Sequence, residues 1–193
     1  MTTPDPVEHS ERLRAAVLAL KAPQAAKRAP APTSSVYGRA AAAVPDDVRP
    51  RTTRESLNTR FRNVETSALM SGTTMVLLVH PDRGPLPEPL FRSLELLVAA
   101  HAVVVALGPE MPRDVPQDRG RPLTVPLRED DDLATEWALL ALGPQKRVAF
   151  LARRAVDGWD WMITRDTVAV QRAGTAILER VPFLGLSVPA LEG

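Results

Sequence analysis

Two short runs of apolar residues constrain the fold of this chain more than any other feature. They cover Met75–Val79 and residues 102–107. A half-exposed strand alternates apolar and polar residues, whereas these runs do not, so both predict strands that are buried on both faces. Residues 88–100 between them carry apolar side chains at helical spacing. The pattern predicts a β–α–β unit with parallel strands and a right-handed crossover.

The second half of the chain predicts a different arrangement. Leu123–Leu127 is expected to be an edge strand because it contains Pro126. Three apolar runs follow, over residues 133–142, 147–154 and 159–164. Short glycine-containing connections join them, which favours antiparallel hairpins. Asp166 is expected to cap a last helix, with Val168 among its inward-facing residues. We therefore expect an α/β fold, with a mixed sheet made of one βαβ unit and an antiparallel meander, flanked by helices.

The N-terminal region has a composition unlike that of the rest. Residues 22–50 are mostly alanine and proline and contain one aromatic residue, Tyr37. So few bulky apolar side chains cannot offset an ordering cost of roughly 1–2 kcal/mol per residue. We expect residues 1–51 to form a flexible arm, disordered or partly helical. Its helical part, residues 7–21, has a narrow apolar stripe that either docks on something or frays.

The ordered domain is expected to span residues 52–193. The stretch from Thr52 to Glu55 has the spacing of a capping box, and the helix that it opens is expected to end at Gly72. At the other end, residues 183–189 form an apolar tail. Such a tail is expected to cover either its own core or a second copy of the chain, so that a homodimer is one expected assembly.

Several classes of protein are disfavoured by composition. The chain has no cysteine, and hence no disulfide, thiolate metal site or cysteine nucleophile. Its apolar runs are far shorter than the ~20 residues of a membrane span, and its first residues lack a secretory signal. We expect a cytoplasmic protein without a cofactor or metal. The acidic run at residues 129–132 lacks the spacing of a calcium loop, and residues 130–132 are expected to keep the loop before residue 133 hydrated.

His80 and Asp82 form the first candidate site. The tripeptide His80-Pro81-Asp82 directly follows a predicted parallel strand, at the end where open α/β sheets place their ligands. These side chains are either a metal-binding or acid–base pair or part of a polar loop. No nucleophile–base pair is visible elsewhere in the sequence, so we do not expect an enzyme.

Glu136 is the second candidate, because it lies in an apolar run. A buried carboxylate needs a partner, and the next predicted strand offers Arg147, Arg153 or Arg154. The alternative is a contact between Glu136 and a ligand.

The three tryptophans, Trp137, Trp159 and Trp161, all fall in the predicted meander. Trp159 and Trp161 share one face of a strand because side chains alternate with a period of two. They are either core residues or the walls of a small-molecule pocket. The candidate ligand-binding residues are therefore His80, Asp82, Glu136, Trp137, Trp159 and Trp161.

Charge is distributed unevenly along the chain. Residues 1–62 carry a net charge of +5 and residues 63–193 a net charge of −4. Arg51, Arg54 and Arg62 are expected to line the outer face of the first ordered helix. The alternative function is thus a nucleic-acid-associated protein that uses the basic arm and these arginines, whose binding would weaken with salt. A merely solvated surface gives the same pattern.

Residues 136–166 contain four blocks that resemble the DICT domain, a sensory module of diguanylate cyclases and two-component systems. The blocks are Glu136-Trp137-Ala138-Leu139-Leu140, Leu142-Gly143-Pro144, Phe150-Leu151-Ala152-Arg153 and Met162-Ile163-Thr164-Arg165-Asp166. The resemblance extends upstream to the helix that begins at Arg54-Glu55-Ser56-Leu57 and covers residues 52–181. The chain departs from the family at Arg165, where the family has tyrosine, and in the proline-rich loop at residues 80–89.

The resemblance implies a stand-alone sensory or regulatory domain of bacterial signal transduction. Such a domain is non-catalytic and acts by binding a ligand or a protein, with an output or regulatory protein as its partner.

Overall fold

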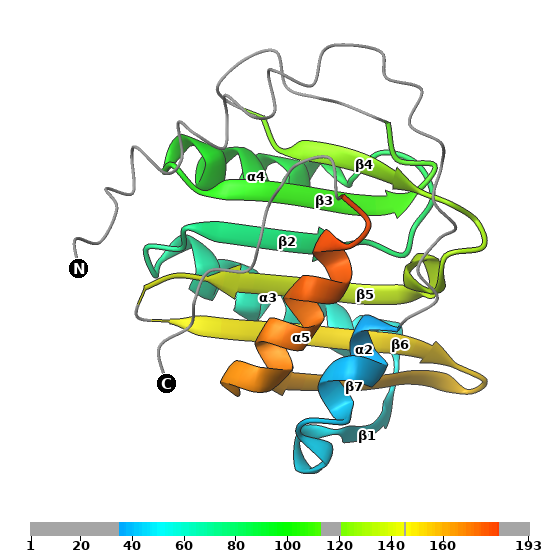
Figure 1. Ribbon diagram of the computed structural model, residues 1–193. Coiled ribbons are helices and arrows are strands. Elements are labelled where there is room, and N and C mark those ends of the chain that lie inside the picture. The colour runs from blue at the N-terminus through cyan, green and yellow to red at the C-terminus, as the bar shows by residue number, and fades with distance from the viewer. Residues whose placement is uncertain (1–34, 113–120, 145, 182–193) are drawn as a thin grey trace.

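The computed structural model describes residues 35–112, 121–144 and 146–181, which form a seven-stranded mixed sheet with helices on both faces (Figure 1). The strands are β1 (Arg49–Thr52), β2 (Met75–Val79), β3 (Val103–Pro109), β4 (Leu123–Leu127), β5 (Glu136–Leu142), β6 (Arg147–Ala155) and β7 (Gly158–Thr164). The α-helices are α2 (Val36–Ala41), α3 (Arg54–Leu69), α4 (Glu88–Ala99) and α5 (Thr167–Leu178). The predicted α/β class is confirmed. None of the helices in the described ranges is long and apolar enough to cross a bilayer.

The sheet has the strand order β1-β7-β6-β5-β2-β3-β4. Strands β2, β3 and β4 are parallel to one another. The pairs β2–β5, β5–β6, β6–β7 and β7–β1 are antiparallel. The βαβ unit, the antiparallel meander and the edge position of β4 are thereby confirmed. At β2 the sheet changes from parallel to antiparallel pairing.

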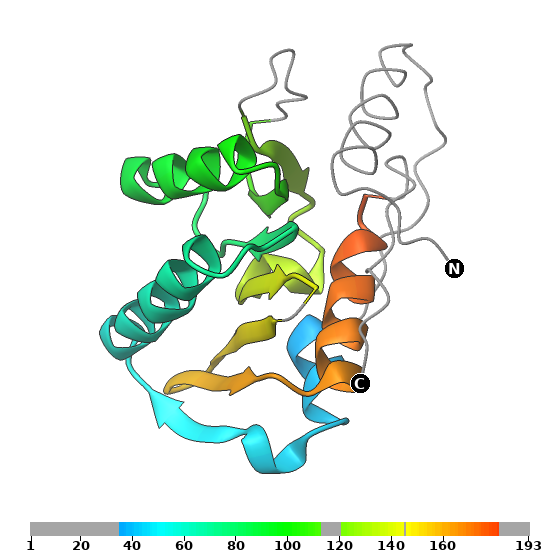
Figure 2. The same cartoon turned by 90° about the vertical axis from the view of Figure 1, so that its left-hand side faces the viewer.

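The helices cover the two faces of the sheet in pairs. Figure 2 shows α3 and α4 on one side and α2 and α5 on the other. Strand β5 serves both faces, because successive side chains alternate: Trp137 and Leu139 pack in the cluster with α3, and Ala138 and Leu140 in the cluster with α5. This alternation separates the functional candidates Glu136 and Trp137, which are adjacent in sequence, onto opposite faces.

Helix α5 is capped by Asp166, as predicted, whose side chain accepts a hydrogen bond from the Ala169 N–H at 2.8 Å. The predicted inward position of Val168 is wrong, since that side chain is 49% exposed. Val170 is buried in its place, because the inner face of the helix follows Ala169, Val170 and Ala173.

The expected arm extends too far into the chain, because residues 35–51 belong to the folded domain. In α2, Val36 and Tyr37 are buried against the sheet, and β1 pairs with β7. Two bulky side chains suffice because the sheet already presents an apolar face, and alanines allow α2 to pack closely on α5. The domain therefore begins before residue 52. The predicted helix at residues 7–21 and the apolar tail at 183–189 lie outside the described residues.

Residues 35–52 form an N-terminal strap that passes around the β7 edge of the sheet, from the face of α2 to the face of α3 (Figure 2). The Trp161 indole N–H fastens it by donating to the Pro50 carbonyl at 3.0 Å. A Cβ on Gly158, whose φ is +132°, would lie 2.9 Å from the Thr52 carbonyl oxygen, so this close approach requires glycine. The cap of α3 is Thr53 and not the predicted Thr52, since the Thr53 hydroxyl accepts from the Ser56 N–H.

Candidate functional site

Polar side chains gather at the edge of the sheet where the parallel strands end. Strand β5 begins at this edge because it runs antiparallel to β2, with Val79 opposite Ala138. His80, directly after β2, therefore lies near the start of β5, and its backbone N–H donates to the Leu107 carbonyl of β3 at 2.9 Å. The polar groups form two clusters on opposite faces of the sheet.

The His80 cluster consists of Arg54, His80, Asp82 and Trp137. His80 is 5% exposed, and its ring stands edge-on to the Trp137 ring with centroids 6.0 Å apart. Its Nδ1 accepts a hydrogen bond from the Asp82 backbone N–H at 3.3 Å. The neutral ring therefore carries its proton on Nε2, which lies 3.9 Å from an Asp82 carboxylate oxygen.

Burial lowers the pKa of His80, and the Asp82 carboxylate opposes that shift. The nearby Arg54 guanidinium lowers the pKa further. An imidazole whose pKa lies below its usual value of 6.5 is neutral at neutral pH. In that state His80 offers one N–H donor without adding a charge to the cluster.

Arg54 and Asp82 form an ion pair above this histidine, and each side chain is about half exposed. Arg54 stands in the first turn of α3, where its guanidinium carbon lies 6.0 Å from the centre of the Trp137 ring. The cluster thus unites three predicted ligand-binding residues with Arg54, which the sequence placed in the nucleic-acid alternative. The cluster therefore combines a half-exposed Arg54–Asp82 ion pair with the buried rings of His80 and Trp137.

Gly108 of β3 permits this arrangement. A Cβ at this position would lie 2.8 Å from the His80 carbonyl oxygen and 2.9 Å from the Met111 methyl carbon. Any larger residue therefore displaces the segment that carries His80. No sequence pattern identifies Gly108, because its role depends on the neighbouring segment that carries His80.

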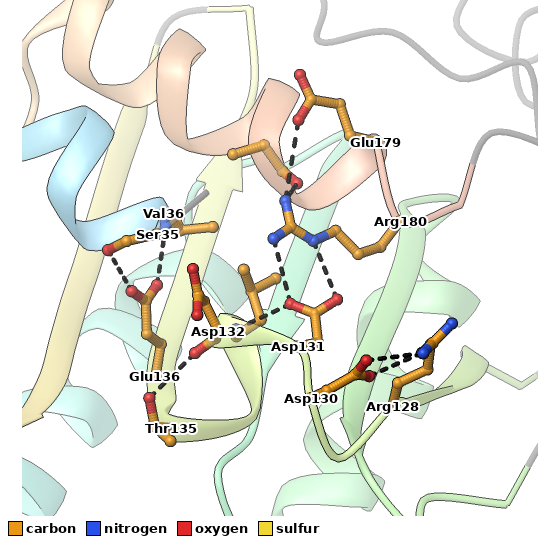
Figure 3. A network of polar contacts seen from close by, with 12 residues as sticks. Ser35, Val36, Arg128, Asp130, Asp131, Asp132, Thr135, Glu136, Glu179 and Arg180 are labelled. Carbon is orange, nitrogen blue, oxygen red and sulfur yellow. Dashed lines mark hydrogen bonds and ion pairs between the residues drawn. The ribbon is translucent and has the colours of Figure 1, made fainter. Parts of the chain in front are cut away.

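The Glu136 cluster lies on the opposite face (Figure 3). The Glu136 carboxylate accepts a hydrogen bond from the Ser35 hydroxyl and from the backbone N–H groups of Val36 and Tyr37, at 2.9 and 3.1 Å. Glu136 is 2% exposed, and burial raises its pKa, while these hydrogen bonds and the charge of Arg153 oppose the rise. The carboxylate fastens the N-terminal strap to β5.

The predicted arginine partner of Glu136 is thus wrong. Arg153 lies opposite Glu136 in the β5–β6 pair, but it acts on the carboxylate through its charge and not through a hydrogen bond. Its guanidinium lies over the Tyr37 ring, 5.0 Å from the centroid, and 3.5 Å from Asp160. The true donors were not predicted because residues 35–37 lie in the stretch whose composition predicts a flexible arm.

A buried ion pair between Asp131 and Arg180 lies close to the Glu136 cluster (Figure 3). The closest nitrogen and oxygen are 3.2 Å apart, and the side chains of Arg180 and Asp131 are 3% and 4% exposed. Arg180 also donates to the Ala176 carbonyl at 2.7 Å, and Asp131 accepts from the Leu133 N–H at 2.9 Å. The pair anchors the end of α5 to the turn before β5, so the expectation that residues 130–132 only keep the loop hydrated is wrong for Asp131.

The tryptophans pack in the core on the α3 side. Trp137, Trp159 and Trp161 are 2%, 7% and 8% exposed and belong to one apolar cluster. Trp137 contacts Phe61 and Phe150 at centroid distances of 4.9 and 5.5 Å. This packing favours the core interpretation for all three, with only Trp137 reaching the His80 cluster.

The three arginines of the nucleic-acid alternative are paired with carboxylates. Arg51 lies beside Asp160, Arg54 pairs with Asp82, and Arg62 pairs with Glu65. Arg51 stands in β1 and not on α3, so the predicted line along one helix is wrong for it. Phosphate binding by these residues would have to displace the carboxylates.

Comparisons with known proteins identify no relatives: no family model matches the chain, and neither a curated protein nor a solved structure resembles it significantly. Within the described ranges, no three histidine or acidic side chains are grouped so that they would hold a metal ion. The function must therefore be inferred from the geometry of the two clusters.

Proposed function

We propose that this chain is a non-catalytic sensory or regulatory domain of bacterial signal transduction, which acts in the cytoplasm and binds a ligand or an output protein through the His80 cluster. One observation carries the proposal: the half-exposed Arg54–Asp82 ion pair lies beside the buried His80 where the sheet changes from parallel to antiparallel pairing. Open α/β sheets bind ligands outside the carboxyl ends of their parallel strands, and His80 and Asp82 follow the carboxyl end of β2. The resemblance of residues 52–181 to the DICT domain supports a regulatory role.

The chemistry of the cluster favours a ligand with a carboxylate or phosphate group. Such a group competes with Asp82 for the Arg54 guanidinium, whose pairing with an exposed carboxylate is weak. The His80 Nε2–H supplies a second donor. Binding thus exchanges an ion pair within the domain for one with the ligand.

Binding suits the cluster better than catalysis. His80 uses Nδ1 to accept from the backbone of Asp82, and its Nε2 faces a carboxylate. Nucleophilic catalysis by a histidine base requires a hydroxyl or thiol within hydrogen-bond reach of the ring. Among the described residues, no serine or threonine hydroxyl makes such a bond with His80.

A thermal-shift screen of the full chain with small carboxylates, phosphates and nucleotides tests the proposal. A ligand at a hundredfold excess over its Kd should raise the Tm by about 5–10 °C. The shift should persist in Arg92→Ala, which loses only an exposed ion pair with Glu88, and vanish in Arg54→Ala. Asp82→Asn should bind the same compound up to about fivefold more tightly, because Arg54 is released.

Two results would count against this function. One is a screen, together with native mass spectrometry, that finds neither a ligand nor a protein partner. The other is equal binding by the wild type and Arg54→Ala. Binding to duplex DNA that falls steeply with salt, and that Arg51→Ala and Arg62→Ala weaken, would instead support the nucleic-acid alternative.

A further inference from the structure

Three arginines lie around β7 on the side of the sheet that α3 covers. Strand β7 lies between β6 and β1 (Figure 1), and residues directly opposite each other in an antiparallel pair share a face. Arg154 of β6 is opposite Trp159, and Arg49 of β1 is opposite Trp161. Both tryptophans pack in the cluster with α3, so both arginines lie on that face. Arg60 of α3 completes the group, which we call the arginine patch: Arg49, Arg60 and Arg154.

The arginine patch carries positive charge that no described carboxylate neutralises. Arg51, Arg54 and Arg62 each pair with a carboxylate, whereas no described carboxylate forms an ion pair with an arginine of the patch. Arg49 donates to a backbone carbonyl instead, that of Asp46, at 3.0 Å. The patch therefore favours an anionic partner.

Arg60 is positioned by an aromatic ring. Its guanidinium carbon lies 4.1 Å from the centre of the Trp161 ring, and its Nε–H is buried without an acceptor. No other described residue forms an ion pair or a hydrogen bond with this side chain. A planar guanidinium that is stacked on a tryptophan keeps its orientation while its donors can bind an oxyanion.

The centre of the patch is apolar. Side chains alternate along β7, so Trp159, Trp161 and Ile163 form one row on the α3 side. The tryptophans are nearly buried, and Ile163 is partly exposed. Interfaces between proteins commonly have an apolar centre and a polar rim, and arginine and tryptophan are enriched among the residues that contribute most to binding. The composition of the patch is typical of such an interface.

We propose that the arginine patch binds an acidic segment of a partner protein. Charge complementarity selects this occupant, because each guanidinium can bind an aspartate or glutamate carboxylate through two parallel hydrogen bonds. The partly exposed Ile163 offers an apolar contact between those charges. This surface is separate from the His80 cluster, and binding of a small ligand beside Arg54 does not depend on it.

The size of the patch favours a protein segment over a nucleic acid. Arg49 and Arg154 lie on the two strands that flank β7, so their backbones are about 10 Å apart across the sheet. Three contacts within that distance are fewer than the roughly 6–10 phosphate contacts of a typical DNA-binding protein. Trp159 and Trp161 are only 7% and 8% exposed, and so offer no free face on which bases could stack.

Fluorescence anisotropy of a labelled poly-glutamate peptide, titrated with the full chain, tests the proposal. The double variant Arg60→Ala, Arg154→Ala should weaken binding by at least about tenfold, because each lost arginine removes charge-assisted hydrogen bonds to a carboxylate. The double variant Arg92→Ala, Arg172→Ala is the matched control, since it removes the same charge from α4 and α5. This control should bind like the wild type, and so should Arg54→Ala.

Two single variants separate geometry and stability from charge. Arg60→Lys keeps the charge but loses the planar group that stacks on Trp161, and should weaken binding by about threefold. Arg154→Ala changes an exposed side chain and should also weaken binding by about threefold. Its urea unfolding curve should match that of the wild type, so that the test remains valid if Arg60→Ala fails to fold.

Four outcomes overturn the proposal. The first is a peptide that does not bind, or that binds equally to the wild type and to the Arg60 and Arg154 variant. An equal loss in the Arg92 and Arg172 control shows an effect of net charge alone. An equal loss in Arg54→Ala assigns the peptide to the His80 cluster. Duplex DNA that binds more tightly than the peptide, and that Arg154→Ala weakens, assigns the patch to nucleic acid.

Discussion

Glu136 and Asp82 are two carboxylates at the same edge of the sheet, yet their surroundings differ. Glu136 is almost fully buried and accepts hydrogen bonds from three donors of the N-terminal strap. Asp82 is half exposed and is held by Arg54, which is itself half exposed. A buried carboxylate held by three donors maintains the fold, whereas an anionic ligand can displace an exposed carboxylate from an exposed cation.

The largest effect is expected at Asp131–Arg180, which belongs with Glu136 on the structural side of this comparison. Arg180→Ala leaves Asp131 buried without a compensating charge and should lower the free energy of unfolding by about 3–5 kcal/mol. Urea unfolding measures this loss. Arg92→Ala, which removes an exposed ion pair, is the control and should change stability little. Similar losses in both variants would show that the Asp131–Arg180 pair contributes nothing through its burial.

The next largest effect is expected at Glu136. Glu136→Ala leaves the Ser35 hydroxyl and two backbone N–H groups without an acceptor, and should cost about 2–4 kcal/mol. Ser35→Ala removes only one of these donors and the cap of α2, and should cost about 1 kcal/mol. Hydrogen exchange in α2 should rise in the same order. A smaller loss in Glu136→Ala than in Ser35→Ala contradicts the role of Glu136 in fastening the strap.

The pH dependence of stability should have opposite signs at the two clusters. Burial raises the pKa of Glu136, so its contribution is lost as pH rises from its usual 4.5 through the folded-state pKa. Burial lowers the pKa of His80, so its contribution is lost as pH falls from its usual 6.5 through the folded-state pKa. Relative to the wild type, Glu136→Gln should therefore gain stability as pH rises, and His80→Gln as pH falls. Unfolding curves at several pH values measure both trends. If the relative stability of the two variants changed in the same direction with pH, the prediction would be contradicted.

The smallest effects on stability are expected at Arg54 and Asp82. Arg54→Ala and Asp82→Asn should each change the free energy of unfolding by no more than about 1 kcal/mol, because the pair is exposed. Both should nevertheless move the pKa of His80, measured by NMR. Loss of the Arg54 charge should raise it, and loss of the Asp82 charge should lower it. If the pKa of His80 moved in the same direction in both variants, the charges of this ion pair would not control it.

The sequence predicted the elements whose patterns are local. Continuous apolar runs identified β2 and β3, and the short glycine-containing connections identified the meander. The position of His80 and Asp82 directly after a parallel strand predicted them as site residues, and the structure places His80 between Asp82 and Trp137.

The remaining features depend on contacts between distant segments, which no local pattern reports. Ser35 and Glu136 are 101 residues apart, and Asp131 and Arg180 are 49 apart. The composition of residues 35–51 favours disorder, whereas in the structure they pack on the sheet through α2 and the β1–β7 pair. The one available signal was Glu136 within an apolar run, which predicted a buried partner but not its position.

The central claim, that the His80 cluster binds an anion, is tested most directly by the pKa of His80. The NMR titration of its imidazole is measured with and without inorganic phosphate, at constant ionic strength, in the wild type and in Arg54→Ala. We predict that phosphate raises the pKa of His80 saturably in the wild type, because the bound anion favours the protonated ring, and that Arg54→Ala loses this response. A His80 pKa that phosphate leaves unchanged in the wild type, or raises equally in both proteins, would contradict the account.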